Sequence, residues 1–162
     1  MKKRTDPKKG NGHAKFESLK LTECLDCVCY EVRKTARFVI NYYDAALRDA
    51  DLKSNQFIVL VAVAYLKSPN FTKLAGFVGI DQSTLARNLI TVEKQKLVSV
   101  KTGKNRREKL ITLTKKGEHK VEKSFPLWKK AQGRLVGGIG AERWRDIQNE
   151  LRDVVGITKD LS

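Results

Sequence analysis

The chain has 162 residues and carries 33 Lys and Arg against 18 Asp and Glu, a net charge of +15 at pH 7. This length suits one domain around a single core, and no apolar run approaches the roughly 20 residues of a membrane span. The basic N-terminus has no apolar segment behind it, so we expect no secretory signal, and three clustered cysteines fit a reducing cytoplasm rather than a disulfide framework. Only two histidines are present, which disfavours most hydrolase and metal-site chemistry.

The positive charge is concentrated in two regions. Residues 1–20 hold seven Lys or Arg against two acidic residues, and residues 96–116 hold eight against one. Such focused charge indicates a polyanionic partner, and a basic surface that serves only solubility is the alternative. Binding to a membrane surface would need a basic amphipathic helix, whereas the second region falls in a predicted hairpin. The charge pattern therefore favours nucleic acid as the partner.

In chain order, residues 1–19 have the composition of a flexible basic tail. Apolar residues then recur at steps of three and four from about Cys24 to Leu47, which predicts a long amphipathic helix. A second helix is expected from Ser54, acting as its N-cap, to about Leu66, where a Ser-Pro-Asn turn ends it.

The stretch from Thr72 to Lys94 has the pattern of a helix-turn-helix. Thr72 is the predicted N-cap of a short helix over 73–78, and Gly79 breaks that helix. The second helix spans 82–94 and is expected to start at Asp81 or Gln82. One side of it forms a predicted buried stripe, and the opposite face is polar: the stripe is Leu85, Leu89 and Val92, and the polar face is Thr84, Arg87, Asn88 and Thr91.

Two β-rich segments follow, residues 97–100 and 110–114, around a basic tip at 101–109 that contains a glycine and an asparagine. This pattern predicts a β-hairpin. A helix-turn-helix followed by such a hairpin is a winged helix, which here spans about residues 54–114. The fold class is therefore mainly α with a small β-hairpin wing.

Two more amphipathic helices are predicted, over 116–136 and 141–155, separated by a Gly-Gly-Ile-Gly break at 137–140. Pro126 is expected to bend the first of them. The first and last helices of the chain are too apolar to stay exposed, as Trp128 and Trp144 illustrate, and dimerisation is a natural way to bury them. Packing within the same chain is the alternative.

These motifs and their order resemble the MarR family of winged-helix transcription regulators from Cys24 to Val155. The resemblance is carried by Ser83-Thr-Leu-Ala-Arg-Asn-Leu89 and by Asn105-Arg-Arg107 ahead of Leu110-Ile-Thr-Leu-Thr-Lys-Lys-Gly117. The chain departs from the family pattern at Asn105, where an aspartate is usual, and at Lys96, where a glycine is usual. The resemblance implies one MarR-like domain over 20–162 and a homodimer joined by helices at about 24–47, 116–136 and 141–155. Its two winged lobes would straddle a pseudo-palindromic DNA site.

Recognition helix 82–94 and wing 101–109 are the predicted DNA-binding elements. Arg87 can chelate guanine and Asn88 can pair with an adenine edge, whereas the two hydroxyls at the helix start hold phosphate. The wing arginines contact the minor groove or its phosphates. The predicted DNA-binding residues are Ser83, Thr84, Arg87, Asn88, Thr91, Lys101, Lys104, Arg106 and Arg107. An ordinary solvated helix face is the alternative interpretation.

Thiol oxidation and a small-molecule effector are the two predicted means of regulation. A helix start and nearby cations favour the thiolate form, so Cys29 is a candidate redox sensor, with Cys27 and Cys24 as resolving thiols. Inert thiols or a metal site at these cysteines are the alternatives. The crevice between the dimer helices and the winged lobe is the expected effector pocket, lined by aromatic residues that equally suit a core: Phe38, Tyr42, Tyr43 and Phe57.

The predicted function is a dimeric, sequence-specific transcription regulator of the repressor type. The alternative is a non-specific architectural DNA-binding protein that acts through charge alone. No catalytic residues are predicted, because the glycines at 137–140 follow a helix and no Ser/His/acid or paired-carboxylate arrangement is visible. We therefore expect no enzyme activity, no cofactor, no bound metal and no membrane partner.

Overall fold

A computed structural model describes residues 20–102 and 109–161, and its chain divides into two compact units, residues 1–39 and 40–162. In the first unit, the described residues form a 3-10 helix, η1 (Leu21–Asp26), and most of helix α2 (Val28–Ala46). The predicted helix start at Cys24 was wrong, because the chain is extended at Cys27 and the α-helix begins only after it. Nearly every described side chain of this unit is exposed, apolar ones included.

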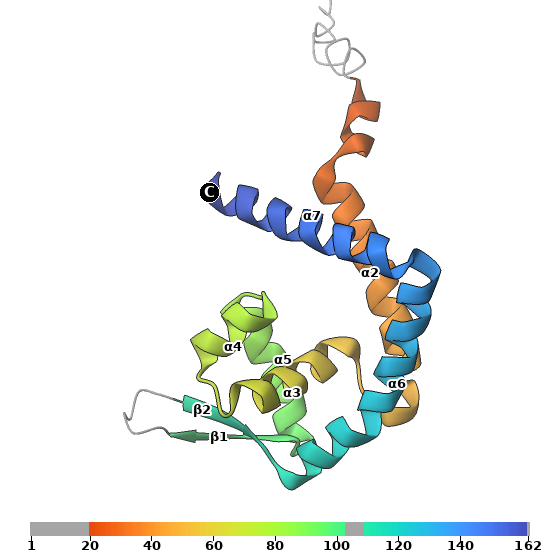
Figure 1. The fold of residues 1–162 in the computed structure, drawn as a ribbon. Coiled ribbons are helices and arrows are strands. Elements are labelled where there is room, and N and C mark those ends of the chain that lie inside the picture. The colour runs from red at the N-terminus through yellow and green to blue at the C-terminus, as the bar shows by residue number, and fades with distance from the viewer. Residues whose placement is uncertain (1–19, 103–108, 162) are drawn as a thin grey trace, which may run out of the picture. The chain divides into compact units, whose positions relative to one another are not determined.

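The second unit contains the rest of the fold (Figure 1). After the end of α2 come the 3-10 turn η2 (Arg48–Ala50) and three helices, α3 (Ser54–Leu66), α4 (Phe71–Val78) and α5 (Gln82–Lys94). Strands β1 (Val98–Thr102) and β2 (Lys109–Leu113) pair antiparallel, and helices α6 (Lys115–Ile139) and α7 (Ala141–Asp160) complete the chain. The structure confirms the predicted fold class, mainly α with a two-stranded hairpin. No helix of the described segments combines the length and apolarity needed to cross a bilayer.

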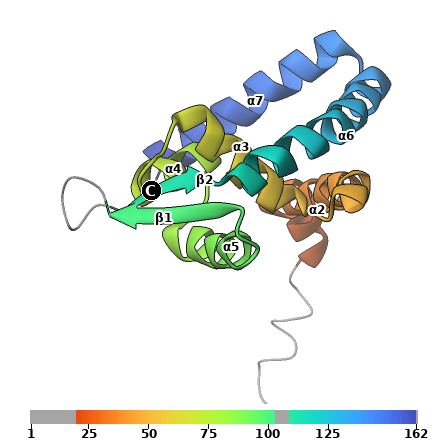
Figure 2. The ribbon, with the colours of Figure 1, turned by 90° about the horizontal axis from the view of Figure 1, so that it is seen from below.

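The winged lobe consists of α3, α4, α5 and the hairpin around one apolar core. Helix α3 is apolar on most of its surface and supplies its centre, and β1 lies alongside α5 at one edge (Figure 2). The predicted stripe of Leu85, Leu89 and Val92 is confirmed, since each side chain is at most 3% exposed. Burying these side chains fixes which face of α5 turns away from the core.

The helix caps of this lobe differ in part from the prediction. Lys53 rather than Ser54 is the N-cap of α3, and the Ser54 hydroxyl instead donates to Asp44. Asn70 rather than Thr72 caps α4, because its side chain accepts from the Lys73 amide. Both predictions failed because several polar residues precede each helix, and tertiary partners decide which of them caps it.

The turn between the two helices of the helix-turn-helix follows the prediction. Gly79 has a left-handed backbone (φ 75°) and ends α4, and Asp81 then caps α5 by accepting from the Thr84 amide. A glycine adopts that backbone without steric cost, which explains its place in the turn.

Helix α6 continues through Gly137 and Gly138 to Ile139, so the predicted break at 137–140 was wrong except at its last residue. Glycine lowers helix stability by only about 1 kcal/mol, so two glycines do not by themselves end a long helix. Only Gly140, with φ 93° and ψ 134°, leaves the helical conformation. Helix α7 then runs to Asp160, five residues beyond its predicted end.

A tight junction joins α5, β1 and the start of α6. Lys96 follows α5 with a left-handed backbone (φ 59°), and the Lys96 and Leu97 amides bond back to the carbonyls of Glu93 and Val92, a Schellman motif. The Thr114 amide donates to the Leu97 carbonyl (3.0 Å), and Lys116 Nζ donates to the Gln95 carbonyl (2.9 Å). These bonds fix the base of the hairpin against the end of α5.

Candidate nucleic-acid interface

The polar face of α5 is presented outward. Arg87, Ser83 and Thr91 are exposed, whereas Thr84 and Asn88 are half-buried at its flank. The buried stripe lies on the opposite side of the same helix, so the five polar side chains predicted to bind DNA share the solvent-facing side. No residue of this set lies in the core.

Asp81 organises the start of α5. Its Oδ1 accepts from the Ser83 hydroxyl (2.5 Å) and the Thr84 amide (2.8 Å), and its Oδ2 accepts from the Thr84 hydroxyl (2.7 Å). The hydrogen bonds from the Ser83 hydroxyl, then those from Thr84, hold the pKa of Asp81 well below its ordinary value. For either hydroxyl to bind phosphate, as predicted, it would have to leave this carboxylate.

Arg87 is oriented by the same network. Its Nη2 donates to Thr84 Oγ1 at 3.2 Å, and the Thr84 hydroxyl donates in turn to Asp81. The guanidinium carries five N–H donors, so one bond to Thr84 restrains the side chain while leaving most of its donors for another partner.

Asn88 contacts a helix outside the helix-turn-helix. Asn55 Nδ2, in the first turn of α3, donates to Asn88 Oδ1 at 3.1 Å. One edge of the Asn88 carboxamide is therefore turned toward α3. The two residues are 33 positions apart, and no local pattern in the sequence indicates their contact.

The wing is described only at its base. Lys101 lies on β1, opposite Leu110 of β2, with an exposed side chain. The other predicted wing residues, Lys104, Arg106 and Arg107, lie outside the described residues. Ser99 and Thr112 pair across the two strands through a hydroxyl hydrogen bond of 2.8 Å, which supports the strand register.

The three cysteines lie where η1 gives way to α2. Cys24 is in η1, Cys27 is in the extended link, and Cys29 is in the first turn of α2. All three thiols are free and exposed. Within the described ranges, no group of three or more His, Cys, Asp or Glu side chains is placed to hold a metal ion.

The aromatic residues predicted to line an effector pocket have different surroundings. Phe57 is buried in the core and stacks on Trp128, with ring centroids 6.0 Å apart. The Tyr42 hydroxyl donates to the Ala131 carbonyl (2.9 Å), and the Tyr43 hydroxyl donates to Gln132 Oε1. Burial, and to a smaller extent Tyr42, raise the pKa of Tyr43. Phe38 belongs to the first unit, where its ring is exposed.

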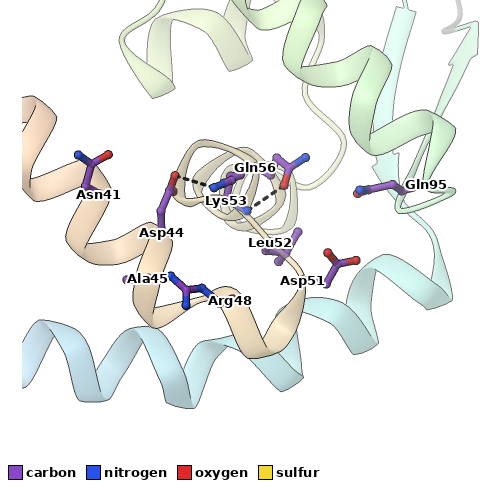
Figure 3. A pocket seen from close by; sticks show the side chains of 9 residues that line it. All are labelled: Asn41, Asp44, Ala45, Arg48, Asp51, Leu52, Lys53, Gln56 and Gln95. Carbon is purple, nitrogen blue, oxygen red and sulfur yellow. Dashed lines mark hydrogen bonds and ion pairs between the residues drawn. The ribbon is translucent and has the colours of Figure 1, made fainter.

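A polar cavity of about 460 Å³ opens where α2 ends and α3 begins (Figure 3). Gln95 Oε1 is buried there, with no hydrogen-bond partner among the described residues. None of the four predicted aromatic residues lines it. No pattern in the sequence groups its lining residues, which are Asn41, Asp44, Ala45, Arg48, Asp51, Leu52, Lys53, Gln56 and Gln95.

Asp44, at the edge of this cavity, links α2 to α3 through hydrogen bonds and an ion pair. Its Oδ1 accepts from the Ser54 amide (2.7 Å) and hydroxyl (2.8 Å), and its Oδ2 lies 3.4 Å from Lys53 Nζ. Burial alone would raise the pKa of Asp44, but the hydrogen bonds from Ser54 and Lys53 outweigh burial and lower it. The first turn of α3, which carries Asn55, is thereby held to the last turn of α2.

Comparison with known proteins places this geometry among transcription regulators. No family model matches the chain. An uncharacterised HTH-type transcriptional regulator of Bacillus subtilis, YwoH, is 25% identical over 93 residues, which are 57% of this chain and 68% of YwoH. A MarR-family transcriptional regulator from Rhodococcus sp. RHA1 shares the fold, with a TM-score of 0.68 and 22% identity over 85% of this chain and 96% of its own.

The transcriptional regulator MosR of M. tuberculosis, solved in complex with DNA, superposes with a TM-score of 0.76. It is 30% identical to this chain, and the match covers 83% of this chain and 97% of MosR. The match thus covers nearly the whole of a known transcriptional regulator. The chain belongs to the MarR family of winged-helix transcriptional regulators.

Proposed function

We propose that the protein is a homodimeric, sequence-specific DNA-binding repressor that inserts α5 into the major groove. The observation that carries the proposal is the outward face of α5, where Asp81 and Thr84 hold the Arg87 guanidinium in the solvent. An arginine so placed can donate two bonds to guanine O6 and N7, the commonest specific contact in the major groove. The MosR complex with DNA supports the same use of the fold.

The remaining predicted residues divide into base readers and backbone contacts. Asn88 and Thr91 flank Arg87 on α5 and face base edges. Lys101, together with Lys104, Arg106 and Arg107 of the wing, is proposed to follow the phosphates beside the groove. Ser83 and Thr84 are proposed to hold phosphate once the duplex displaces Asp81 from their hydroxyls.

A second copy of the chain is proposed to cover apolar side chains that each unit leaves exposed. In the second unit, Phe125 of α6 is 47% exposed, and Leu151 and Val155 of α7 are 46% and 52% exposed. In the first unit, Val28 and Val32 of α2 are exposed by 65% and 45%. Large apolar surfaces of this kind are unfavourable in a monomer, and a twofold dimer would bury them and pair two recognition helices for a pseudo-palindromic site.

Two signals are proposed to relieve DNA binding. The exposed thiols of Cys29, Cys27 and Cys24 are accessible to an oxidant, and a disulfide between two of them would alter the start of α2. A small-molecule effector is the other signal. The polar cavity beside Asp44 and Lys53 is a better-formed place for it than the predicted aromatic residues, because Phe57 already packs in the core.

Selection of binding sites from a random duplex library, with and without oxidant, tests the proposal. The full chain should enrich a pseudo-palindrome, and Arg87→Ala should weaken binding to it about tenfold or more while changing binding to random DNA much less. Arg143→Ala removes an exposed arginine of α7 and is the matched control. Equal affinity for selected and random DNA would favour the architectural alternative and overturn sequence-specific regulation.

Affinity for the selected site should also fall steeply with salt, by roughly 10³-fold between 50 and 200 mM, because a dimer with several phosphate contacts releases many counterions. A flat salt profile would contradict the assignment of the wing cations. Size-exclusion chromatography with light scattering checks the homodimer, and a monomer at micromolar concentration would contradict it.

A further inference from the structure

We propose that Asn55 of α3 is a positioning residue for base recognition, an inference that rests on the proposed function. By holding Asn88 Oδ1, Asn55 turns the Asn88 Nδ2 group toward the groove. Asn88 then favours guanine, through O6 and N7, or thymine, through O4, over adenine, whose N7 acceptor lies beside the N6 amine donor. The bidentate contact with adenine expected from its residue type is thereby disfavoured.

This inference follows from the hydrogen-bond donors and acceptors of the Asn88 carboxamide. An asparagine side chain has an acceptor edge, Oδ1, and a donor edge, Nδ2, and adenine recognition uses both edges on one base. In the structure, the acceptor edge faces Asn55 Nδ2 at 3.1 Å. Oδ1 keeps a second lone pair, but an oxygen held by Asn55 is no longer free to turn toward an adenine amine, so the N–H donors are the groups best placed for the duplex.

The position of Asn55 is fixed by its neighbours in the chain. Ser54, the preceding residue, is held to Asp44 by its amide and its hydroxyl, and the Lys53 amide donates to Gln56 Oε1 at 2.9 Å. These bonds immobilise the first turn of α3, and Figure 3 shows Asp44, Lys53 and Gln56 gathered there. Asn55 is thus presented to Asn88 from a rigid element, as positioning requires.

Replacement of Asn55 by aspartate reverses the proposed orientation. A carboxylate only accepts hydrogen bonds, so it would bind Asn88 Nδ2 and turn Oδ1 toward the groove. The side chain keeps its size and is exposed, and a negative charge in the first turn of a helix is favourable, so the fold should persist. Asn55→Ala removes the bond without adding charge.

The test is binding-site selection by the wild-type chain, Asn55→Asp, Asn55→Ala and Asn88→Ala. The base pair that Asn88 reads is the one whose preference disappears in Asn88→Ala. At that pair the wild type should prefer an acceptor, guanine or thymine, by about three- to tenfold, the worth of one hydrogen bond. Asn55→Ala should reduce this preference, and Asn55→Asp should shift it toward bases with an exocyclic amine, adenine or cytosine.

The double variant Asn55→Asp with Asn88→Ala separates positioning from direct contact. The negative charge of Asn55→Asp should weaken binding to all DNA sites alike, with or without the Asn88 side chain. The shift in base preference, by contrast, should vanish when Asn88 is replaced by alanine. Three results would each overturn the inference: a wild-type preference for adenine, unchanged preferences in both Asn55 variants, or a shift in preference that persists without Asn88. In each case a DNA site is still selected, so the proposed function would stand. Selection that enriches no site at all would overturn both.

Discussion

Substitution of Gly117 by alanine should disrupt the junction between the wing and α6. Gly117 is buried in the first turn of α6, and a methyl carbon there would lie 1.9 Å from the Leu97 carbonyl oxygen and 2.9 Å from its carbonyl carbon. Carbon–oxygen contacts are normally no shorter than about 3.3 Å, so the two backbones must separate by about 1.4 Å. The atom displaced is the acceptor of the Thr114 amide, so that hydrogen bond would lengthen or break.

The cost follows from three contributions. Forced overpacking costs about 1–3 kcal/mol, and a lost backbone hydrogen bond costs about 1 kcal/mol. The higher helix propensity of alanine offsets about 1 kcal/mol of this. Gly117→Ala should therefore lower the free energy of unfolding by about 1–3 kcal/mol, toward the upper end because the obstacle is backbone rather than a flexible side chain.

Urea unfolding followed by circular dichroism, at one protein concentration, measures the effect. Gly76→Ala is the matched control, because Gly76 is exposed inside α4 and a methyl group there would meet no heavy atom within 4 Å in the described part of the chain. That control should gain up to about 1 kcal/mol from helix propensity alone. If Gly117→Ala unfolds at the same urea concentration as the wild type, the packing argument at this junction is refuted.

Two further substitutions test the contacts around the recognition helix. Lys96→Gly should raise the free energy of unfolding by up to about 1 kcal/mol in the same assay. Lys96 has a left-handed backbone (φ 59°), which is unfavourable for a residue with a Cβ atom and not for glycine. A lower free energy of unfolding in the variant would contradict this reasoning. Asp44→Asn should destabilise it at pH 7 by about 1 kcal/mol. The pKa of Asp44 is lowered by folding, so its carboxylate stabilises the fold above the ordinary value of 3.8, and this contribution is lost as the pH falls through and below that value. The difference from the wild type should therefore close in acid, and a gap that stays constant from pH 7 to pH 3 would contradict the role assigned to the charge.

The sequence alone was enough for the order of the elements and for the outward face of α5. Leu85, Leu89 and Val92 recur at helical spacing, and burial of that stripe leaves Arg87 on the other side, whatever the rest of the chain does. The hairpin was equally predictable, since two β-rich segments flank a turn-forming basic tip. Local periodicity and turn chemistry carry both signals.

Only the tertiary structure decided which groups bond to which. Asn55 and Asn88 meet across 33 residues, and Asp44 takes the hydroxyl of Ser54 that local pattern assigned to a helix cap. Side chains of the same type compete for such partners, and the winner depends on how helices pack rather than on neighbours in the chain. Lys96 illustrates both the information in the sequence and the information in the tertiary structure. The sequence marked it as unusual for its position, and the structure supplied the reason, a left-handed turn that a glycine would enter without strain.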